Sequence, residues 1–538
     1  MKRRNFLKAA AVGGAAAAAS VSMNARRANA VSLFGDVPTD HSSIMLPKQN
    51  QVTSILECFM YGGVTPWEGF YCVPSYGTEG KTWHKTYPVD FLNAAKACSY
   101  SDPGLFTFFG KDSGSTVTGS LAEPKDIFLS PFLAPLIART DITDRMRIVV
   151  NRHALEPHEA AIPLTMAGAT LGSPSLASLG AHVARYFVDH DVEAKHPAPF
   201  AYGIVGSGGF IPTDNILTML ATGLHPGAAR PLHIKMNDVA RLTALINRTP
   251  IGSLEDRARY DALLGFYFGQ YQNRLKFGSS GDILRAPRFG ELSAAANSLA
   301  HAKDIQDLLA PEYLARVPGT ACFTRGGAQT LDGSAVGTSL TTATANYPGM
   351  SLKMAAHLLT HPTAPAAHCM VIDTGLVAAD GGGGYDTHRE TPFTQSHNLK
   401  NFFDSLLPLV NAPGETDPNK IDLNKTMIIL NMEFGRTPGI QTAGSTANTG
   451  RNHWPYGYTQ VYIGGPITKA QKGVYGTIPE NGQATVYTTP TENRIAALLA
   501  MGIWPFDQSS FSSAQVQDSS SESNAVRSVL KRVLGYTV

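Results

Sequence analysis

The sequence predicts an α/β fold: a mostly parallel, doubly wound sheet with helices on both faces, plus a helical insertion. Three observations predict it. Long segments with helical spacing separate the strand-like runs, an alternation that is typical of parallel sheets. Polar or glycine-rich segments directly follow several of the runs, as loops do at the carboxyl ends of parallel strands. The strand-like runs themselves are short and apolar, at 54–60, 145–150, 369–372, 426–431 and 458–463.

The first part of the chain is expected to begin the sheet. Residues 54–60 (SILECFM) are the first predicted strand, and the turn Gly62-Gly63 follows them. Residues 72–120 are rich in Gly, Ser, Thr and aromatic residues, so we expect irregular structure there. The apolar residues of 127–137 recur with helical spacing, which predicts a helix.

The second predicted strand, 145–150, leads into a polar segment that contains His153. Pro157 suits the first position of a helix, so His158 would lie in the first turn of that helix. A further helix is expected to begin at Ser173-Pro174-Ser175. Two histidines therefore follow the carboxyl end of this strand.

Residues 205–345 are predicted to form a largely helical insertion or cap. This part of the sequence contains no dense polar motif. A helix at 350–359 then leads back to the strand at 369–372. Within the insertion, helical spacing occurs at 238–247, 254–273 and 304–314.

The last third of the chain continues the alternation. Thr391 and Pro392 suit the N-cap and the first position of a helix. Residues 426–431 (TMIILN) are the most strand-like segment of the sequence, and 458–463 are the last predicted strand. The remaining helices are expected at 492–501 and from 524 onward.

Residues 1–30 have the three parts of an export signal. Lys2-Arg3-Arg4 precede an apolar run at 9–19, and Ala28-Asn29-Ala30 offer a small-residue cleavage site. The paired arginines are typical of the twin-arginine route, which predicts a periplasmic or extracellular protein. No other run of about 18 apolar residues occurs, so we expect no transmembrane segment in the mature chain. Residues 31–538 would then form a single α/β domain.

The composition argues against some kinds of binding partner and metal site. Charged residues make up 16% of the 538 residues and hydrophobic residues 43%, which is typical of a globular protein. The net charge is +2 and no basic patch or arm stands out, so we expect no nucleic-acid partner. The five cysteines have no C-x-x-C spacing, which argues against a thiolate zinc site.

Four side chains are the strongest candidates for metal ligands. Asp386 and His388 follow one predicted strand, Glu433 follows another, and His453 comes shortly before a third. Ligand sites of parallel sheets lie beyond the carboxyl ends of the strands, so we expect these loops to meet there. Mixed nitrogen and oxygen ligands suit a divalent metal: zinc, manganese, iron or calcium.

Each of these residues also has an alternative interpretation. Asp386 could be a turn residue, and His388 or His453 could be an ordinary loop histidine. Glu433 could instead form a structural ion pair with Arg436.

Further candidates complete the predicted site. A second metal would need more ligands, for which Glu68 and His397 are the candidates and Thr65 is a weaker one. His397 lies away from the apolar stripe of its helix, so exposure to solvent is the alternative for this residue. The planar guanidinium of Arg436 suits sulfate, phosphate or carboxylate, and His158 is a candidate acid or base.

Five short sequences form a recognisable set. They are Asp386-Thr387-His388, Glu433-Phe434-Gly435-Arg436-Thr437-Pro438, Asn452-His453-Trp454, the segment 62–70 and the run from His158 to Leu176. Together they resemble the exported family known as domain of unknown function 1501. That resemblance implies a relation to the sulfatase and alkaline phosphatase superfamily, and hence a doubly wound sheet and a metal-dependent site.

The sequence departs from that pattern in three places. Asn452 and Glu68 stand where the family commonly has Asp. Sulfatases carry a Cys or Ser nucleophile in a C-x-P-x-R run, whereas the run that begins at Cys72 (CVPSY) lacks the arginine. We therefore expect direct attack by an activated water molecule rather than a covalent intermediate.

The sequence thus predicts an exported metal-dependent hydrolase of sulfate or phosphate esters, with a small anionic ester or glycan as substrate. The alternative is a non-catalytic exported protein that kept the sheet and acts in envelope assembly or surface binding. A third interpretation, carbohydrate binding through Trp67, Trp83 and Trp454, rests on composition alone.

Overall fold

The computed structural model describes most of residues 43–189 and of residues 346–537, and little of the chain between them. The predicted export signal and most of the predicted insertion lie outside the described residues, as does the helix start at 173–175. The described residues are 43–76, 106–117, 120–170, 177–189, 201–206, 231–236, several positions between 255 and 270, 346–376, 383–388, 391–439, 450–506 and 511–537.

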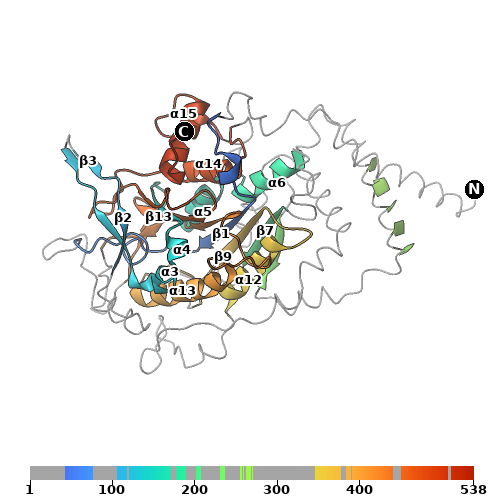
Figure 1. Ribbon diagram of the computed structural model, residues 1–538, viewed down its shortest axis with the longest axis horizontal. Coiled ribbons are helices and arrows are strands. Elements are labelled where there is room, and N and C mark those ends of the chain that lie inside the picture. Colours follow the sequence, from blue (N-terminus) through green and yellow to red (C-terminus); the bar gives the residue numbers. More distant parts are fainter. Residues whose placement is uncertain are drawn as a thin grey trace, which may run out of the picture.

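An eight-stranded sheet forms the centre of the described structure (Figure 1). All its neighbouring strands pair in parallel except β13, which runs antiparallel to both of its neighbours. The protein is therefore an α/β protein with a mostly parallel sheet, as the alternation of strands and helices predicts. In spatial order the strands are β14 (Gly473–Tyr475), β6 (Met146–Asn151), β13 (Tyr458–Gly464), β10 (Thr426–Asn431), β1 (Ser54–Met60), β9 (His368–Asp373), β7 (Tyr202–Gly206) and β8 (Leu232–Lys235).

The central strands are covered on both faces, and this explains their nearly continuous apolar sequences. Every residue of β1, β9, β10 and β13 is buried. Leu56, Cys58 and Met60 of β1 pack in the core that α12 (Tyr347–Thr360) and α13 (Thr391–Leu406) complete.

Helices of the other face pack on the alternate residues of the same strands. Ile55 of β1 lies in a core with residues of α6 (Leu179–Asp189), α14 (Pro490–Ala500) and α15 (Glu522–Val529). Phe59 lies in a smaller core with residues of α5 (His158–Ala167). Figure 1 shows α12 and α13 on one side of the sheet and α6, α14 and α15 on the other.

Local sequence signals set the ends of the helices. Thr489 and Glu492 form a capping box at the start of α14, and Pro490 occupies its first turn. Gly168 ends α5 in the left-handed conformation, with φ of 68°. Pro157 directly precedes α5 in an extended conformation, so the helix begins at His158, one residue later than predicted.

Two predictions for residues 72–137 were wrong. The stretch expected to be irregular contributes strands, and the first residues of the expected helix 127–137 form strand β5. The helix starts only after β5 because Ser130 caps a turn with Pro131 at its first position, and because β5 pairs with β2. The elements are β2 (Thr107–Lys111), β3 (Ser115–Val117), β4 (Ser120–Ala122), β5 (Asp126–Leu129), η3 (Pro131–Leu133), α3 (Ala134–Ile137) and α4 (Thr140–Thr143).

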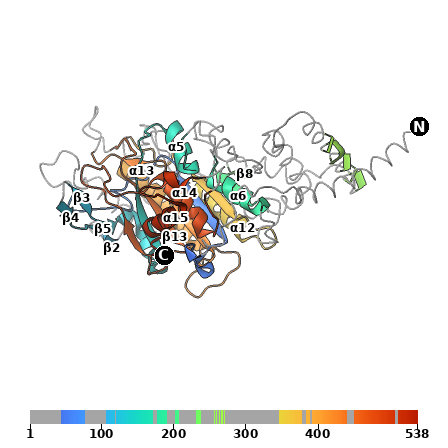
Figure 2. The same cartoon turned by 90° about the horizontal axis from the view of Figure 1, so that it is seen from above.

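The two small hairpin sheets, β2–β5 and β3–β4, lie together at one end of the molecule (Figure 2). Strand β8 falls within the segment predicted as a helical insertion, yet it forms an edge of the main sheet. The described positions between 255 and 270 are helical, as predicted. Short elements complete the fold: η2 (Lys48–Asn50), η8 (Leu407–Leu409), β11 (Gly435–Arg436), β12 (His453–Trp454), η9 (Ser513–Gln515) and η10 (Leu530–Leu534).

Among the described residues, no helix combines the length and the apolar character that crossing a membrane requires.

Candidate metal centre

The candidate site lies where several loops meet at one edge of the sheet. Asp386, Glu433 and His158 follow the carboxyl ends of β9, β10 and β6, respectively. Strand β13 runs in the opposite direction, so the segment before it, which contains His453, reaches the same edge. The short ladder β11–β12 pairs Arg436 with His453 and so fixes this segment beside the loop after β10.

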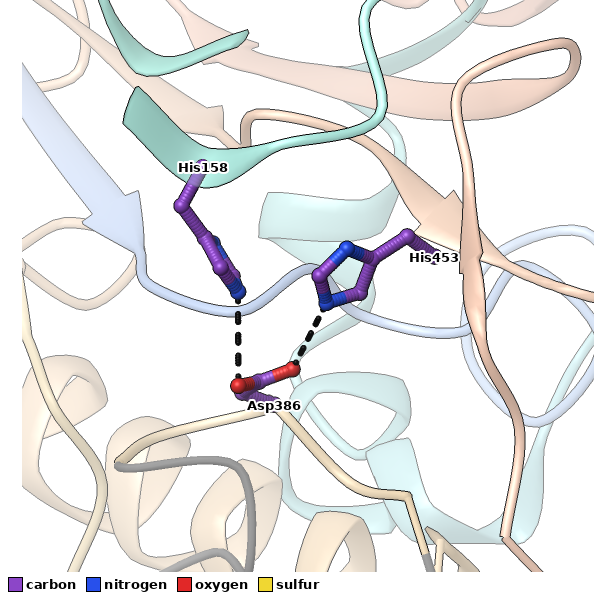
Figure 3. A group of neighbouring side chains, drawn as sticks. All are labelled: His158, Asp386 and His453. Atoms are coloured by element: carbon purple, nitrogen blue, oxygen red, sulfur yellow. Dashed lines mark hydrogen bonds and ion pairs between the residues drawn. The ribbon is translucent and has the colours of Figure 1, made fainter. Parts of the chain in front are cut away.

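Three imidazoles converge on the carboxylate of Asp386. The Nε2 atoms of His388 and His453 lie 3.0 Å and 3.2 Å from its Oδ1. The Nε2 atom of His158 lies 3.3 Å from its Oδ2 (Figure 3). Among the described residues, His158, Asp386 and His453 form a group whose ligand atoms all lie within 4.8 Å of one another.

The other nitrogen of each ring faces an oxygen acceptor outside the cluster. His158 Nδ1 lies 2.9 Å from Glu433 Oε1, and His453 Nδ1 lies 3.0 Å from the carbonyl oxygen of Glu156. His388 Nδ1 lies 3.0 Å from Asn452 Oδ1. Because these oxygens accept hydrogen bonds, each Nδ1 carries a proton, and in a neutral ring Nε2 then carries a lone pair.

This arrangement can hold a bound cation, because a neutral ring with its proton on Nδ1 directs the Nε2 lone pair toward Asp386. Without an ion, His158 has a different state: burial lowers its pKa, but Asp386 and Glu433 outweigh burial and raise the pKa to about 9, so near pH 7 the ring is charged and pairs with both carboxylates. The buried Nε2 of His158 has no hydrogen-bond partner among the described residues, although Asp386 is close. Metal-bound histidines have the same pattern: the second ring nitrogen donates to a carboxylate or a carbonyl.

The distances are also those expected between the ligands of one ion. Ligands about 2.0–2.2 Å from a tetrahedral or octahedral ion lie roughly 3–3.5 Å apart. The three Nε2–oxygen distances around Asp386 fall in this range. A set of three nitrogens and one carboxylate suits zinc, manganese or iron, whereas calcium prefers oxygen ligands.

The charges around Asp386 keep it ionised. Burial raises its pKa, but the interactions with the imidazoles of His158, His388 and His453 and the positive charge of Arg436 together hold the pKa well below its usual range. Burial lowers the pKa of His453, and it outweighs the interaction with Asp386, so this ring is neutral near pH 7. A neutral His453 beside an ionised carboxylate is the form that binds a metal.

The turn Gly62-Gly63 brings the loops close together. Gly62 has φ of 95°, and a Cβ atom there would lie 2.1 Å from the backbone nitrogen of Asp386. Its N–H donates to Glu433 Oε1 at 2.7 Å, and its carbonyl accepts from Arg436 Nε at 2.9 Å. Only glycine combines this backbone conformation with so close an approach.

Arg436 holds the site together rather than facing solvent. Its side chain is fully buried and donates to the carbonyls of Gly62 and Arg451 and to Asp386 Oδ1. These four hydrogen bonds occupy all but one of the five N–H groups of the guanidinium. The expected role as a clamp for a substrate anion finds no support in this geometry. Arg436 forms its ion pair with Asp386, so the alternative interpretation of Glu433 as the partner of Arg436 finds no support.

The other predicted ligands lie around the cluster rather than in it. Glu433 orients His158 through Nδ1, and its Oε2 has no partner among the described residues. Glu68 forms a buried ion pair with Arg451, at 2.9 Å. His397, the other candidate for a second metal, is buried in α13, so the alternative of solvent exposure does not hold. Among the described residues, the group of ligand atoms that lie within 4.8 Å of one another includes none of His388, Glu433, Glu68 and His397, although His388 contacts Asp386.

Sequence reasoning missed several residues that shape the site. The ring of Phe434 stacks on His453, with centroids 4.3 Å apart, and Tyr61 stacks on His158 at 5.1 Å. The carbonyl of Glu156 leaves no signal in a sequence, because every residue has one. The amide of Asn452, next to His453, could have been recognised as a hydrogen-bond partner of a ligand.

Cys72 does not resemble a nucleophile in this structure. Its side chain is buried, and its thiol donates to the carbonyl of Trp67 at 3.0 Å. Nucleophilic cysteines are accessible and lie in electropositive surroundings.

Comparison with known families bears on the same part of the chain. Residues 373–503 match the family model described as "Protein of unknown function (DUF1501)". This segment is similar to that family. It contains Asp386, His388, Glu433, Arg436 and His453, whereas His158 and Gly62 lie outside it. No curated protein and no solved structure matches the chain.

Proposed function

We propose that this protein is an exported, metal-dependent hydrolase of sulfate or phosphate esters. One observation carries the proposal: three imidazole Nε2 atoms converge on Asp386, while each Nδ1 donates to an acceptor outside the cluster. We further propose that the scaffold is related to the sulfatases and alkaline phosphatases. Support for that relation comes from the mostly parallel sheet and from the site at the carboxyl ends of its strands.

The residues divide into two roles under this proposal. His158, His388, His453 and Asp386 would hold a zinc, manganese or iron ion. A bound ion of this kind polarises an ester oxygen and lowers the pKa of a water molecule to near neutrality. Arg436 is a positioning residue because it fixes Asp386, and it would not bind the substrate. His158 would be a ligand rather than an acid or base, and Glu433 orients it.

Metal analysis of the purified exported protein tests the ligand set. We expect about one transition-metal ion per chain in the wild type and little or none in Asp386→Asn, because that substitution removes the charge on which the imidazoles converge. The matched control is Asp404→Asn, which removes a carboxylate paired with Lys400 in α13, away from the cluster. Circular dichroism checks that both variants are folded. Equal metal content in the wild type and in Asp386→Asn would refute the assignment.

Activity tests the reaction separately. A panel of chromogenic sulfate, phosphate and phosphodiester substrates, with and without added metals, should show turnover that chelation removes. Export is tested by locating the mature protein after blocking the twin-arginine route. The predicted signal at residues 1–30 predicts retention of the uncleaved precursor in the cytoplasm.

One observation favours the alternative of a non-catalytic exported protein. Arg436 donates its hydrogen bonds within the protein, so it does not provide the expected anion clamp. Cys72 is buried, so it does not provide a nucleophile either, as the sequence predicts. A protein that binds metal at Asp386 yet hydrolyses no ester in the panel would support this alternative.

A further inference from the structure

A second recess lies beside the candidate metal centre. It is a cavity of about 540 Å³ between the loop after β6, the loop after β12 and the start of α14. Its volume is within the range of about 300–1,000 Å³ that small-molecule sites occupy. The residues that matter for its chemistry are Arg152, His153, Tyr456, Tyr487, Thr489 and Gln517.

Two connections join this cavity to the metal centre. His153 lines the cavity, and its Nε2 donates to the carbonyl oxygen of Glu433 at 2.6 Å. Tyr456 also lines it, and its hydroxyl donates to Glu156 Oε1 at 3.0 Å. The carbonyl oxygen of Glu156 accepts the hydrogen bond from His453 Nδ1. Glu433 and Glu156 therefore each contact both a residue of the cavity lining and a histidine of the cluster.

The lining of the cavity has one formal charge, that of Arg152. The guanidinium donates to the carbonyl of Ala484 through Nη1 at 2.9 Å and lies 5.3 Å from the centre of the Tyr487 ring. No other partner of its side chain occurs among the described residues, so N–H groups remain for an anion. With no carboxylate in the lining, the cavity is complementary to a negatively charged ligand.

The rest of the lining suits a hydroxylated ring. The rings of Tyr456 and Tyr487 offer apolar faces with polar edges. Tyr456 is held by its bond to Glu156 and by an edge contact with Trp454 at 5.0 Å. The amide of Gln517 and the hydroxyl of Thr489 add neutral polar groups. Aromatic faces with a few fixed polar groups are typical of small-ligand sites.

We infer that this cavity is a subsite for an anionic sugar ring, with Arg152 on the acidic group and the two tyrosines on the ring. In the substrate, this ring would be the part that does not react, held beside the ester that the metal centre cleaves. That last step rests on the proposed function, whereas binding of the ring does not.

Three small sugar probes test the subsite. Binding is measured by titration calorimetry with methyl glucuronide, which carries a carboxylate, and with methyl glucoside, which has the same ring without the charge. Glucose 6-sulfate is the sulfate counterpart and shows which anion is preferred, with turnover of it monitored separately. We expect both anionic sugars to bind more tightly than methyl glucoside.

Variants then locate the binding. Arg152→Gln should weaken binding of the better anionic sugar about tenfold or more, since a hydrogen bond to a charged group is lost. The matched control, Arg527→Gln, removes the same charge from an exposed position on α15 and should leave binding unchanged. Ala154→Trp, at an exposed position in the lining, should block the cavity without disturbing the core.

The outcomes separate this inference from the proposed function. Charge-dependent binding that Arg152→Gln and Ala154→Trp both reduce supports the subsite, even if no ester is hydrolysed. Equal affinity for methyl glucuronide and methyl glucoside overturns it. So does anionic-sugar binding that neither variant changes, even if the metal centre proves active.

Discussion

His388 owes its orientation to Asn452. The sequence resemblance leads one to expect Asp at position 452, but the amide oxygen lies 3.0 Å from His388 Nδ1 and can accept the same hydrogen bond. An amide in this position therefore preserves the ligand, although it supplies no charge. The change from Asp to Asn is a weaker argument against a metal site than the sequence alone indicates.

Removing the amide should weaken the metal site. We expect Asn452→Ala to lower metal affinity about 10- to 100-fold, as loss of a partner of a metal-bound histidine does, and Asn452→Asp to retain or improve it. Competition with a metal chelator measures the affinity. Asn481→Ala, which alters an exposed turn, is the control. Unchanged affinity in Asn452→Ala would mean that His388 is not a ligand.

The individual residues also show what a sequence can and cannot reveal about a site. Asp386, His388 and His453 were predicted as ligands, and their ligand atoms lie together, because each borders a strand that is easy to recognise. The roles of Glu433 and Glu68 could not be predicted from the sequence, because they depend on His158 and Arg451, which are far away along the chain.

At the scale of elements, one buried ion pair joins the centre of the sheet to α14. Glu57 lies in the middle of β1 and is fully buried. Its Oε1 accepts from Arg494 Nη1 and from Asn431 Nδ2, both at 2.7 Å, and its Oε2 lies 3.0 Å from His368 Nε2. A charge in an otherwise apolar strand is tolerated only with such partners.

The ionisation of Glu57 should make the free energy of unfolding depend on pH in the acid range. Burial raises the pKa of Glu57, but Arg494 and His368 outweigh it and lower the pKa to about 2. The folded pKa lies below the unfolded value, so the stabilisation is complete above about pH 4.5 and is lost as the pH falls toward 2. We expect the free energy of unfolding, measured by urea denaturation, to fall by a few kcal/mol over this interval.

The substitution Glu57→Gln tests the assignment. It leaves Arg494 buried without its counter-charge, which costs roughly 3–5 kcal/mol at neutral pH, and it should remove that part of the acid dependence. Glu415→Gln, in a surface pair with Lys420, should change the stability little. An acid dependence in Glu57→Gln equal to that of the wild type would assign the effect to other carboxylates.

The elements also explain which predictions failed. Helix α13 carries its polar residues Gln395, His397 and Asn398 inward, all of them buried. The helix is thus buried on its polar side as well, and the apolar stripe of its sequence marks only one of the buried faces. Strand β5 was mistaken for part of a helix because short apolar runs fit both periodicities, and its pairing with β2 decides the outcome. The long buried strands had no such ambiguity.

For the molecule as a whole, metal binding should be linked to stability. The proposed ligands come from the segments around β6, β9 and β13, so an ion there would bind the folded chain and not the unfolded one. An ion present at 100 times its dissociation constant adds about 2.7 kcal/mol to the free energy of unfolding. We expect a chelator to lower the unfolding midpoint of the wild type.

The variant Asp386→Asn provides the comparison for that measurement. Its unfolding midpoint should be the same with and without the chelator, because it has little metal to lose. A chelator that lowers both midpoints equally would place the stabilising ion somewhere other than at Asp386.

The position of β1 in the sheet has a consequence for how the chain reaches its native state. This early strand ends at Met60, yet its two neighbours begin only at His368 and Thr426. A ribosome that releases the polypeptide from its N-terminus would expose β1 long before either neighbour exists, and pairings between segments so distant in sequence form slowly. The fragment 373–503 would face the converse problem if expressed alone, because it contains β10 and β13 but lacks β1, β6 and all of β9 except Asp373. The matched segment is therefore not expected to fold on its own.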